Sequence, residues 1–217
     1  AAFPAVVTAC EQEKDYWKVT LDQTAFFPEG GGQAGDTGYL GEIEVFDTHE
    51  KNGEIWHYTR QPLEVGAEVK GVLDWEKRFS RMQQHSGEHI VSGLIHTRFG
   101  YNNVGFHLGE EEVTMDFNGP ITKEELLEIE TAANQVVFGN VPIQISYPSR
   151  EELEILDYRS KIEIEGQVRI VTIPDVDVCA CCAPHVNNTG EIGLIKLTNV
   201  QSHRGGVRVN LLAGDRA

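Results

Sequence analysis

Short segments in which apolar and polar residues alternate fill the N-terminal third of the chain. Three of them lie at residues 19–21, 42–45 and 54–58, and glycine, asparagine and proline separate them. A period of two places the apolar residues on one face of a strand. The pattern therefore predicts a small β-barrel or β-sandwich over residues 1–74.

The pattern changes to a helical period after Asp74, which is a candidate N-cap. Apolar and small residues, among them Ile90 and Gly93, recur at helical spacing until Gly100. A capping-box sequence at residues 122–125 predicts a second helix ending near residue 139, and residues 149–152 open a shorter third one. Strand-like runs follow or intervene at residues 113–117, 143–147, 168–173, 194–200 and 207–212, the last after a turn at Gly205–Gly206. We expect an α+β fold with two domains, residues 1–74 and 75–217.

Composition limits the partners of the protein. Of its 217 residues, 34 are acidic and 18 are lysine or arginine, which gives a net charge of −16. Such an excess argues against broad electrostatic binding to nucleic acid, so RNA would be bound locally or with help from a segment outside this chain. No apolar run approaches the roughly 20 residues of a membrane helix, and the N-terminus lacks the basic region of a signal peptide. Three of the four cysteines lie within residues 179–182, which favours metal or redox chemistry and a reducing cytoplasm over disulfides.

Two separated groups of residues have the composition of a metal site. His85 and His89 are four residues apart and would project from one face of the predicted helix. Residues 181–185, Cys-Cys-Ala-Pro-His, add a thiolate and His185, and zinc takes such ligands in tetrahedral geometry. Spacing alone leaves Cys179, Cys181 and Cys182 as alternatives, and satisfied histidines beside buried structural cysteines remain another interpretation. Structural zinc sites usually contain more cysteine. A ligand set rich in histidine therefore favours a site that activates water over a purely structural one.

Several hydrolase classes do not fit. Glu88 is out of phase for the glutamate of a His-Glu-x-x-His metalloprotease, and the Gly-x-Ser-x-Gly and P-loop motifs are absent.

Three segments resemble motifs of the alanyl-tRNA editing proteins, which are freestanding relatives of the editing domain of alanyl-tRNA synthetase. These are residues 83–90, which contain the histidine pair, residues 181–193, and the glycine-rich residues 26–38. The resemblance implies an N-terminal β-barrel packed on an editing domain shared with threonyl-tRNA synthetase. The family spacing Cys-x-x-x-His selects Cys181 as the thiolate. One departure is Pro184, where the family often has threonine, so a backbone donor and a hydroxyl are missing beside His185.

The resemblance also implies an activity and its site residues. The activity is zinc-dependent hydrolysis of alanine tRNA wrongly charged with serine or glycine, with zinc at His85, His89, Cys181 and His185. A family label of alanine–tRNA ligase would be inherited, because no aminoacylation domain is visible. Thr24 is a candidate to bind the serine hydroxyl, with a plain strand threonine as the alternative. The remaining candidates for substrate binding are Gly30, Gly31 and Gly32, where the backbone can approach a ligand or simply turn, and Gln84, which is otherwise an exposed helix residue.

The sequence leaves three alternatives open. The zinc either activates water or only positions the substrate. The chain is either a catalyst or a non-catalytic, zinc-stabilised RNA-binding module. It is either freestanding or an editing fragment of a longer synthetase-like protein. We expect the tRNA acceptor end to meet a small basic patch made by Arg78, Arg81, Arg204 and Arg208, or a C-terminal tRNA-binding or dimerisation domain beyond this chain to supply most of the affinity.

Overall fold

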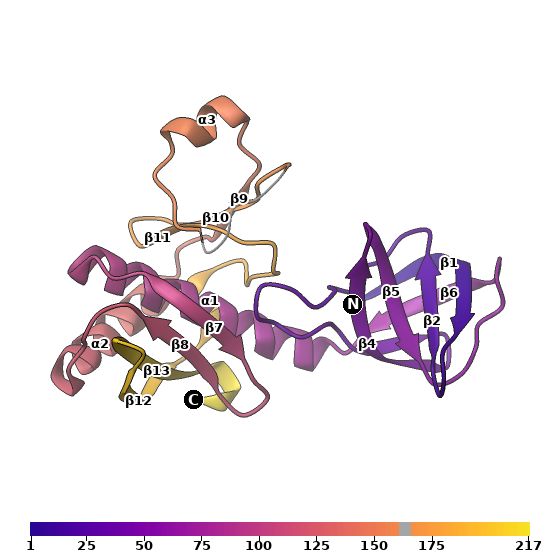
Figure 1. The fold of residues 1–217 in the computed structure, drawn as a ribbon, viewed down its shortest axis with the longest axis horizontal. Helices are drawn as coiled ribbons and strands as arrows, with labels where there is room; N and C mark the ends of the chain where they lie inside the picture. Colours follow the sequence, from indigo (N-terminus) through magenta and orange to yellow (C-terminus); the bar gives the residue numbers. More distant parts are fainter. Residues whose placement is uncertain (161–165) are drawn as a thin grey trace. The chain divides into compact units, whose positions relative to one another are not determined.

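The computed structural model describes residues 1–160 and 166–217 and divides the chain into two compact units (Figure 1). The units are Ala1–Phe79 and Ser80–Ala217. The division falls inside helix α1 (Trp75–Phe99), slightly later than the change of pattern at residue 74 suggests. Strand-rich and helix-containing regions follow one another, so the fold is of the expected α+β class.

The first unit is a closed six-stranded antiparallel barrel with the strand order β1-β2-β5-β4-β3-β6. Pairing of β1 with β6 closes it, with Phe3 opposite Gly71. Alternate residues, such as Val19 and Val45, point inward to a core that contains Phe26 and Leu40. A barrel rather than a sandwich is therefore formed. Its strands are β1 (Ala2–Gln12), β2 (Trp17–Leu21), β3 (Gly38–Leu40), β4 (Ile43–Lys51), β5 (Glu54–Thr59) and β6 (Glu68–Leu73).

Helix α1 is the central element of the second unit. Asp74 caps its start by accepting a hydrogen bond from the Lys77 amide at 3.2 Å, and Gly100, with a φ of +72°, ends it. Between Ser80 and Ile95 nearly every side chain is buried, including several polar ones. Burying a polar side chain costs free energy unless the side chain is hydrogen-bonded or binds a ligand. The buried polar side chains of α1 therefore need hydrogen-bond partners or a ligand.

Two antiparallel sheets flank α1 in Figure 1, one of four strands in the order β12-β13-β8-β7 and one of three in the order β11-β10-β9. Gly87 of α1 lies against the first sheet, and Gly93 against the turn between β10 and β11. The strands are β7 (Asn103–Leu108), β8 (Val113–Phe117), β9 (Gln144–Ser146), β10 (Ile170–Ile173), β11 (Asp177–Ala180), β12 (Ile195–His203) and β13 (Gly206–Ala213).

Both of the helices predicted to follow α1 are present, and each begins with a capping box. Thr122 caps α2 (Lys123–Gly139), and Ser149 caps α3 (Arg150–Ile155). The predicted hairpin turn at Gly205–Gly206 was wrong by one residue. His203 pairs with Gly206, and Arg204 and Gly205 have φ of 46° and 83°, so these two residues make the turn. Positive φ at both central residues is typical of a two-residue hairpin turn.

Among the described residues, no helix combines the length and the apolar character needed to cross a membrane.

Candidate metal centre

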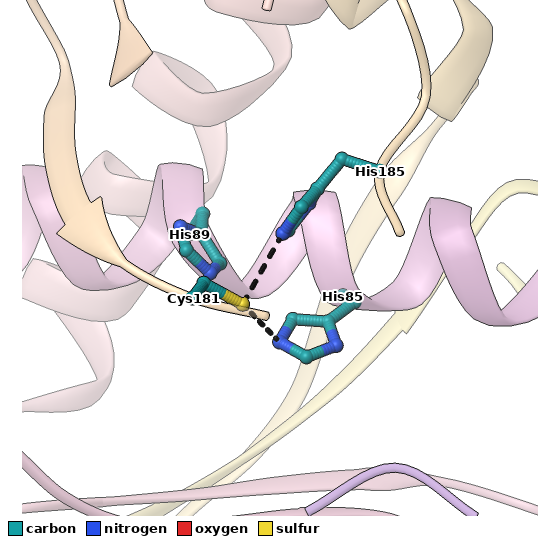
Figure 2. A group of neighbouring side chains, drawn as sticks. All are labelled: His85, His89, Cys181 and His185. Atoms are coloured by element: carbon teal, nitrogen blue, oxygen red, sulfur yellow. Dashed lines mark hydrogen bonds between the residues drawn. The ribbon is translucent and has the colours of Figure 1, made fainter. Parts of the chain in front are cut away.

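Four side chains from two distant segments meet beside α1 (Figure 2). His85 and His89 lie one turn apart on α1, so both rings point to the same side. Cys181 and His185 belong to the segment that follows β11. The four candidate ligand atoms all lie within 4.8 Å of one another. The predicted ligand set is thus brought together by the fold.

The separations inside this cluster suit a tetrahedral metal ion. Cys181 Sγ lies 3.6 Å from His85 Nε2 and 3.5 Å from His185 Nε2. Bonds of about 2.3 Å to sulfur and about 2.0–2.1 Å to nitrogen, at tetrahedral angles, place sulfur and nitrogen about 3.5–3.6 Å apart. The cluster could therefore hold a metal ion without a large rearrangement.

Geometry also distinguishes the three neighbouring cysteines. Burial raises the pKa of Cys181, but hydrogen bonds from His185, His85 and His89 outweigh burial and lower this pKa to about 2. Burial raises the pKa of Cys179, which lies in a separate group with His89 and Asp177. Cys182 is exposed. Cys181 is consequently the thiolate that faces all three histidines.

A buried carboxylate orients His89. His89 Nδ1 donates to Asp177 Oδ2 at 3.1 Å, and Asp177 also accepts bonds from Arg159 Nε at 2.6 Å and Nη2 at 2.9 Å. Burial opposes the charge of His89, yet Asp177 and Cys181 raise the pKa of His89 well above its usual value. Because Nδ1 is committed to Asp177, it is Nε2 that faces the cluster.

Ser86 performs the same task for His185. Ser86 lies on α1 between the two histidine ligands, and its Oγ is 2.9 Å from His185 Nδ1. The Val186 amide donates to the same Oγ at 3.3 Å. Burial, followed by the nearby charge of His89, lowers the pKa of His185 to about 3. The ring is therefore neutral near pH 7 and can offer Nε2 as a ligand.

Gly93 allows the turn between β10 and β11 to approach α1. A Cβ atom on Gly93 would lie 2.3 Å from Val176 O and 2.8 Å from Asp177 Cβ. Only glycine leaves room for this backbone contact. The helical pattern of the sequence includes Gly93, but no local pattern connects Asp177 and Arg159 to His89, so their roles were not predicted.

Gln84 is placed differently from the exposed position considered above. Its side chain is fully buried, Nε2 donates to Ala213 O at 2.5 Å, and Oε1 accepts from the Ala213 amide at 2.7 Å. The exposed-helix alternative is therefore wrong. These bonds give Gln84 a structural task at the end of β13, and its contact with substrate stays a prediction.

The other substrate-binding candidates belong to the first unit. Thr24 is half-buried, and its Oγ1 lies 2.8 Å from His57 Nε2. Gly30 exchanges backbone hydrogen bonds with Gln33 across Gly31 and Gly32, whose φ values are 60° and 81°. The glycines thus make a tight turn, while their approach to a ligand stays a prediction.

Three of the four arginines proposed as a basic patch are engaged within the protein. Arg78 pairs with Asp36, Arg208 makes a two-point bond to Asp116, and Arg81 is buried. Arg204 is exposed at the hairpin turn. The four side chains therefore do not form a shared phosphate-binding patch.

Comparisons with known proteins agree with this architecture. Residues 168–209 match the family described as Threonyl and Alanyl tRNA synthetase second additional domain, and residues 4–77 match tRNA synthetases class II (A). The chain is 36% identical over 202 residues to the alanyl-tRNA editing protein AlaX-L of Pyrococcus horikoshii, covering 89% of this chain and 50% of the relative. The chain is homologous to the alanyl-tRNA editing proteins.

Two further relatives are an editing protein and a ligase. The alanyl-tRNA editing protein Aarsd1 of Rattus norvegicus is 33% identical over 206 residues, which is 92% of this chain and 50% of that protein. The alanine–tRNA ligase of Ignicoccus hospitalis is 34% identical over 211 residues, which is 91% of this chain and 23% of the ligase. The chain spans about half the length of the editing proteins it matches. The family resemblance inferred from the three motifs is confirmed.

Proposed function

We propose that this chain hydrolyses the ester bond of alanine tRNA mischarged with serine or glycine, with a zinc ion at His85, His89, Cys181 and His185. The observation that carries the proposal is the convergence of these four ligand atoms within 4.8 Å. Homology to proteins named alanyl-tRNA editing proteins supports the substrate class.

Zinc is the metal that this donor set favours. One thiolate and three imidazoles are ligands of intermediate softness, and zinc accepts them in tetrahedral geometry. When bound, zinc would supply either a water whose pKa is lowered to about 7 and a polarised carbonyl, or a fixed point for the substrate amino group.

The chain's own residues prepare this site. Cys181 is already a thiolate at neutral pH, because three histidines lower its pKa. Asp177 and Ser86 each hold one Nδ1 atom, so that Nε2 of His89 and of His185 points to the cluster. These two imidazoles do not have to reorient when the metal arrives, which strengthens binding.

Recognition of tRNA is proposed to be local to its acceptor end. The net charge of −16 opposes contact along the whole polyanion. Thr24 and the turn made by Gly31 and Gly32 are the candidates to contact the seryl group and the terminal adenosine. A hydroxyl contact from Thr24 would favour serine over alanine, since a polar site is left unpaired by the smaller residue.

Deacylation of seryl-, glycyl- and alanyl-tRNA for alanine, measured side by side, tests the proposal. We expect rapid hydrolysis of the seryl or glycyl ester, slow hydrolysis of the alanyl ester, and about one zinc ion per chain. His85→Ala and Cys181→Ala should each lose both zinc and activity, whereas Cys182→Ala, at an exposed position, should keep both.

The same experiment separates the alternatives. Tight binding of tRNA without hydrolysis by the zinc-loaded chain would identify a zinc-stabilised binding module. Full zinc content in both His85→Ala and Cys181→Ala would refute the ligand assignment.

A further inference from the structure

One arginine binds the backbone of the loop that carries Cys181. This loop, residues 181–186, follows β11 and is called the ligand loop below. Arg169 lies directly before β10, and its Nη1 donates to the carbonyl oxygens of Cys181 at 2.7 Å and of Ala183 at 2.9 Å. The carbonyl oxygen of Arg169 itself accepts from the Cys181 amide at 3.1 Å. Arg169 therefore binds Cys181 through both its amide and its carbonyl group.

The other end of the ligand loop is held from α1. Ser86 Oγ lies 2.9 Å from His185 Nδ1 and accepts from the Val186 amide at 3.3 Å. Between the two ends lies Pro184, which has no amide hydrogen and so cannot donate a backbone hydrogen bond. Side chains outside the ligand loop, Arg169 at its start and Ser86 at its end, therefore fix its conformation.

The bonds from Arg169 enclose the two residues that separate its carbonyl partners. The Cys181 carbonyl precedes Cys182, and the Ala183 carbonyl follows Ala183. A rotation of the backbone at Cys182 or Ala183 would move one of these carbonyls away from Nη1. In the conformation held in this way, Ala183 is fully buried and Cys182 is exposed. While both bonds persist, the Cys182 side chain stays outside and Cys181 faces the histidines.

This matters because two neighbouring cysteines compete for one position. Both offer the same donor atom, and zinc binds either thiolate in the same way. Chemistry alone therefore does not decide between Cys181 and Cys182, and the choice depends on the backbone.

We propose that Arg169 is a positioning residue that selects Cys181, rather than Cys182, as the thiolate of the metal centre. The inference rests on the proposed zinc site and adds a residue outside its ligands and their direct hydrogen-bond partners. Without the guanidinium, the ligand loop keeps its anchor at Ser86 but loses the bonds that hold Cys182 outside.

Zinc affinity of the full chain, measured by competition with a chelator, is the first test. Arg169→Met should lower the affinity about 10- to 100-fold. Arg169→Lys should stay within about fivefold of wild type, because one nitrogen makes both bonds and an ammonium group also has several hydrogens. Arg216→Met is the control, since Arg216 Nη1 donates to the Gly109 carbonyl at 2.9 Å but contacts none of the four ligands. Equal losses in Arg169→Met and Arg216→Met would overturn the inference.

Alkylation shows which cysteine the metal protects. The zinc-loaded chain is treated with iodoacetamide, and the modified peptides are measured by mass spectrometry. In the wild type we expect modification of Cys182 and protection of Cys181. In Arg169→Met the preference for Cys181 over Cys182 should fall about tenfold, because two hydrogen bonds from a charged donor are lost. A merely stabilising role for Arg169 would leave this preference unchanged, and that result would overturn the inference.

Cobalt(II) tests whether Cys182 can replace Cys181 once Arg169 is removed. With Arg169 in place, Cys181→Ala should show no sulfur-to-cobalt charge-transfer absorption. In the Arg169→Met/Cys181→Ala protein part of this absorption should return, and a further Cys182→Ala change should remove it. Sulfur absorption in Cys181→Ala alone, or none in a folded Arg169→Met/Cys181→Ala protein, would contradict the selection by Arg169.

None of these measurements depends on hydrolysis, so the two proposals fail in different ways. Zinc binding with the expected change of preference in Arg169→Met, but without deacylation of any ester, would refute the proposed function and leave the role of Arg169 established. Deacylation by a zinc-loaded wild type whose preference for Cys181 is unchanged in Arg169→Met would overturn this inference alone. A wild-type chain that binds neither zinc nor cobalt would overturn both.

Discussion

His89 donates its Nδ1 hydrogen to Asp177 at 3.1 Å, and both Asp177 oxygens in turn accept from Arg159. The three side chains form one buried line that ends at the four candidate metal ligands. Because Arg159 holds the carboxylate in place, the His89 ring has one orientation with Nε2 toward Cys181.

Replacing Asp177 with asparagine should weaken zinc binding. The amide keeps the shape but loses the charge, and Arg159 is left beside a neutral group. We expect zinc affinity to fall about 10- to 100-fold, measured by competition with a chelator. Asp116→Asn is the matched control, because Arg208 binds Asp116 in the same two-point manner at 2.7 and 2.8 Å without touching a ligand. Equal losses of affinity in both variants would contradict a specific role for Asp177.

Gly93→Ala should disturb the metal centre through the backbone. The added methyl group would meet Val176 O and Asp177 Cβ at distances that force the turn between β10 and β11 away from α1. We expect a loss of about 1–3 kcal/mol in the free energy of unfolding, together with weaker zinc binding.

Gly139→Ala provides the comparison for Gly93→Ala. Gly139 is also helical, but no atom would lie within 4 Å of its new methyl group. This change should stabilise the protein by up to about 1 kcal/mol and leave zinc affinity unchanged. Unaltered zinc affinity in a folded Gly93→Ala protein would show that Asp177 does not depend on the close approach.

His57 should make the protein less stable in mild acid. Its pKa is about 4 in the folded chain, against an ordinary value of 6.5, so the unfolded chain binds the proton first as pH falls. The free energy of unfolding should therefore decrease between about pH 6.5 and pH 4, by roughly 3 kcal/mol in total from this group. His57→Gln lacks this titrating group. The difference in unfolding free energy between wild type and His57→Gln should therefore narrow as pH falls from about 6.5 to 4. A difference that is constant with pH would argue against a buried neutral imidazole.

The acidic charge should limit binding of whole tRNA. The net charge is −16, and Arg78 and Arg208, two of the four arginines of the expected basic patch, are already paired within the protein. We expect weak binding of alanine tRNA and a shallow salt dependence, corresponding to about three phosphates or fewer. A short acceptor mimic charged with serine should still be hydrolysed, since the chemistry is local. Steeply salt-dependent, tight binding by this chain alone would contradict this view.

Local signals in the sequence predicted local features well. Asp74, Thr122 and Ser149 begin helices because each is a capping side chain next to a helical pattern. Spacing also indicated the candidate metal ligands His85, His89 and His185, whereas Cys181 was selected among three neighbouring cysteines only by the family resemblance.

Features that depend on contacts between distant segments were not predicted. Strands β1, β3 and β6 are completed by pairing around the barrel, which no short pattern encodes. The burial of Gln84 depends on the backbone of Ala213 at the other end of the unit's sequence. Asp177 reaches His89 only because Gly93 admits the turn that carries it.

The two segments that supply the candidate metal ligands are far apart in the sequence and are therefore translated at different times. His85 and Cys181 are separated by 96 positions, so the histidine pair leaves the ribosome long before its partners are translated. Until β10 and β11 have folded onto α1, the early histidines have no thiolate to share an ion with. A cation held by all four side chains would close a loop of nearly a hundred residues, and closing so long a loop removes much of the freedom of the unfolded chain. Capture of the ion would thus fix the segment that follows β11 against α1.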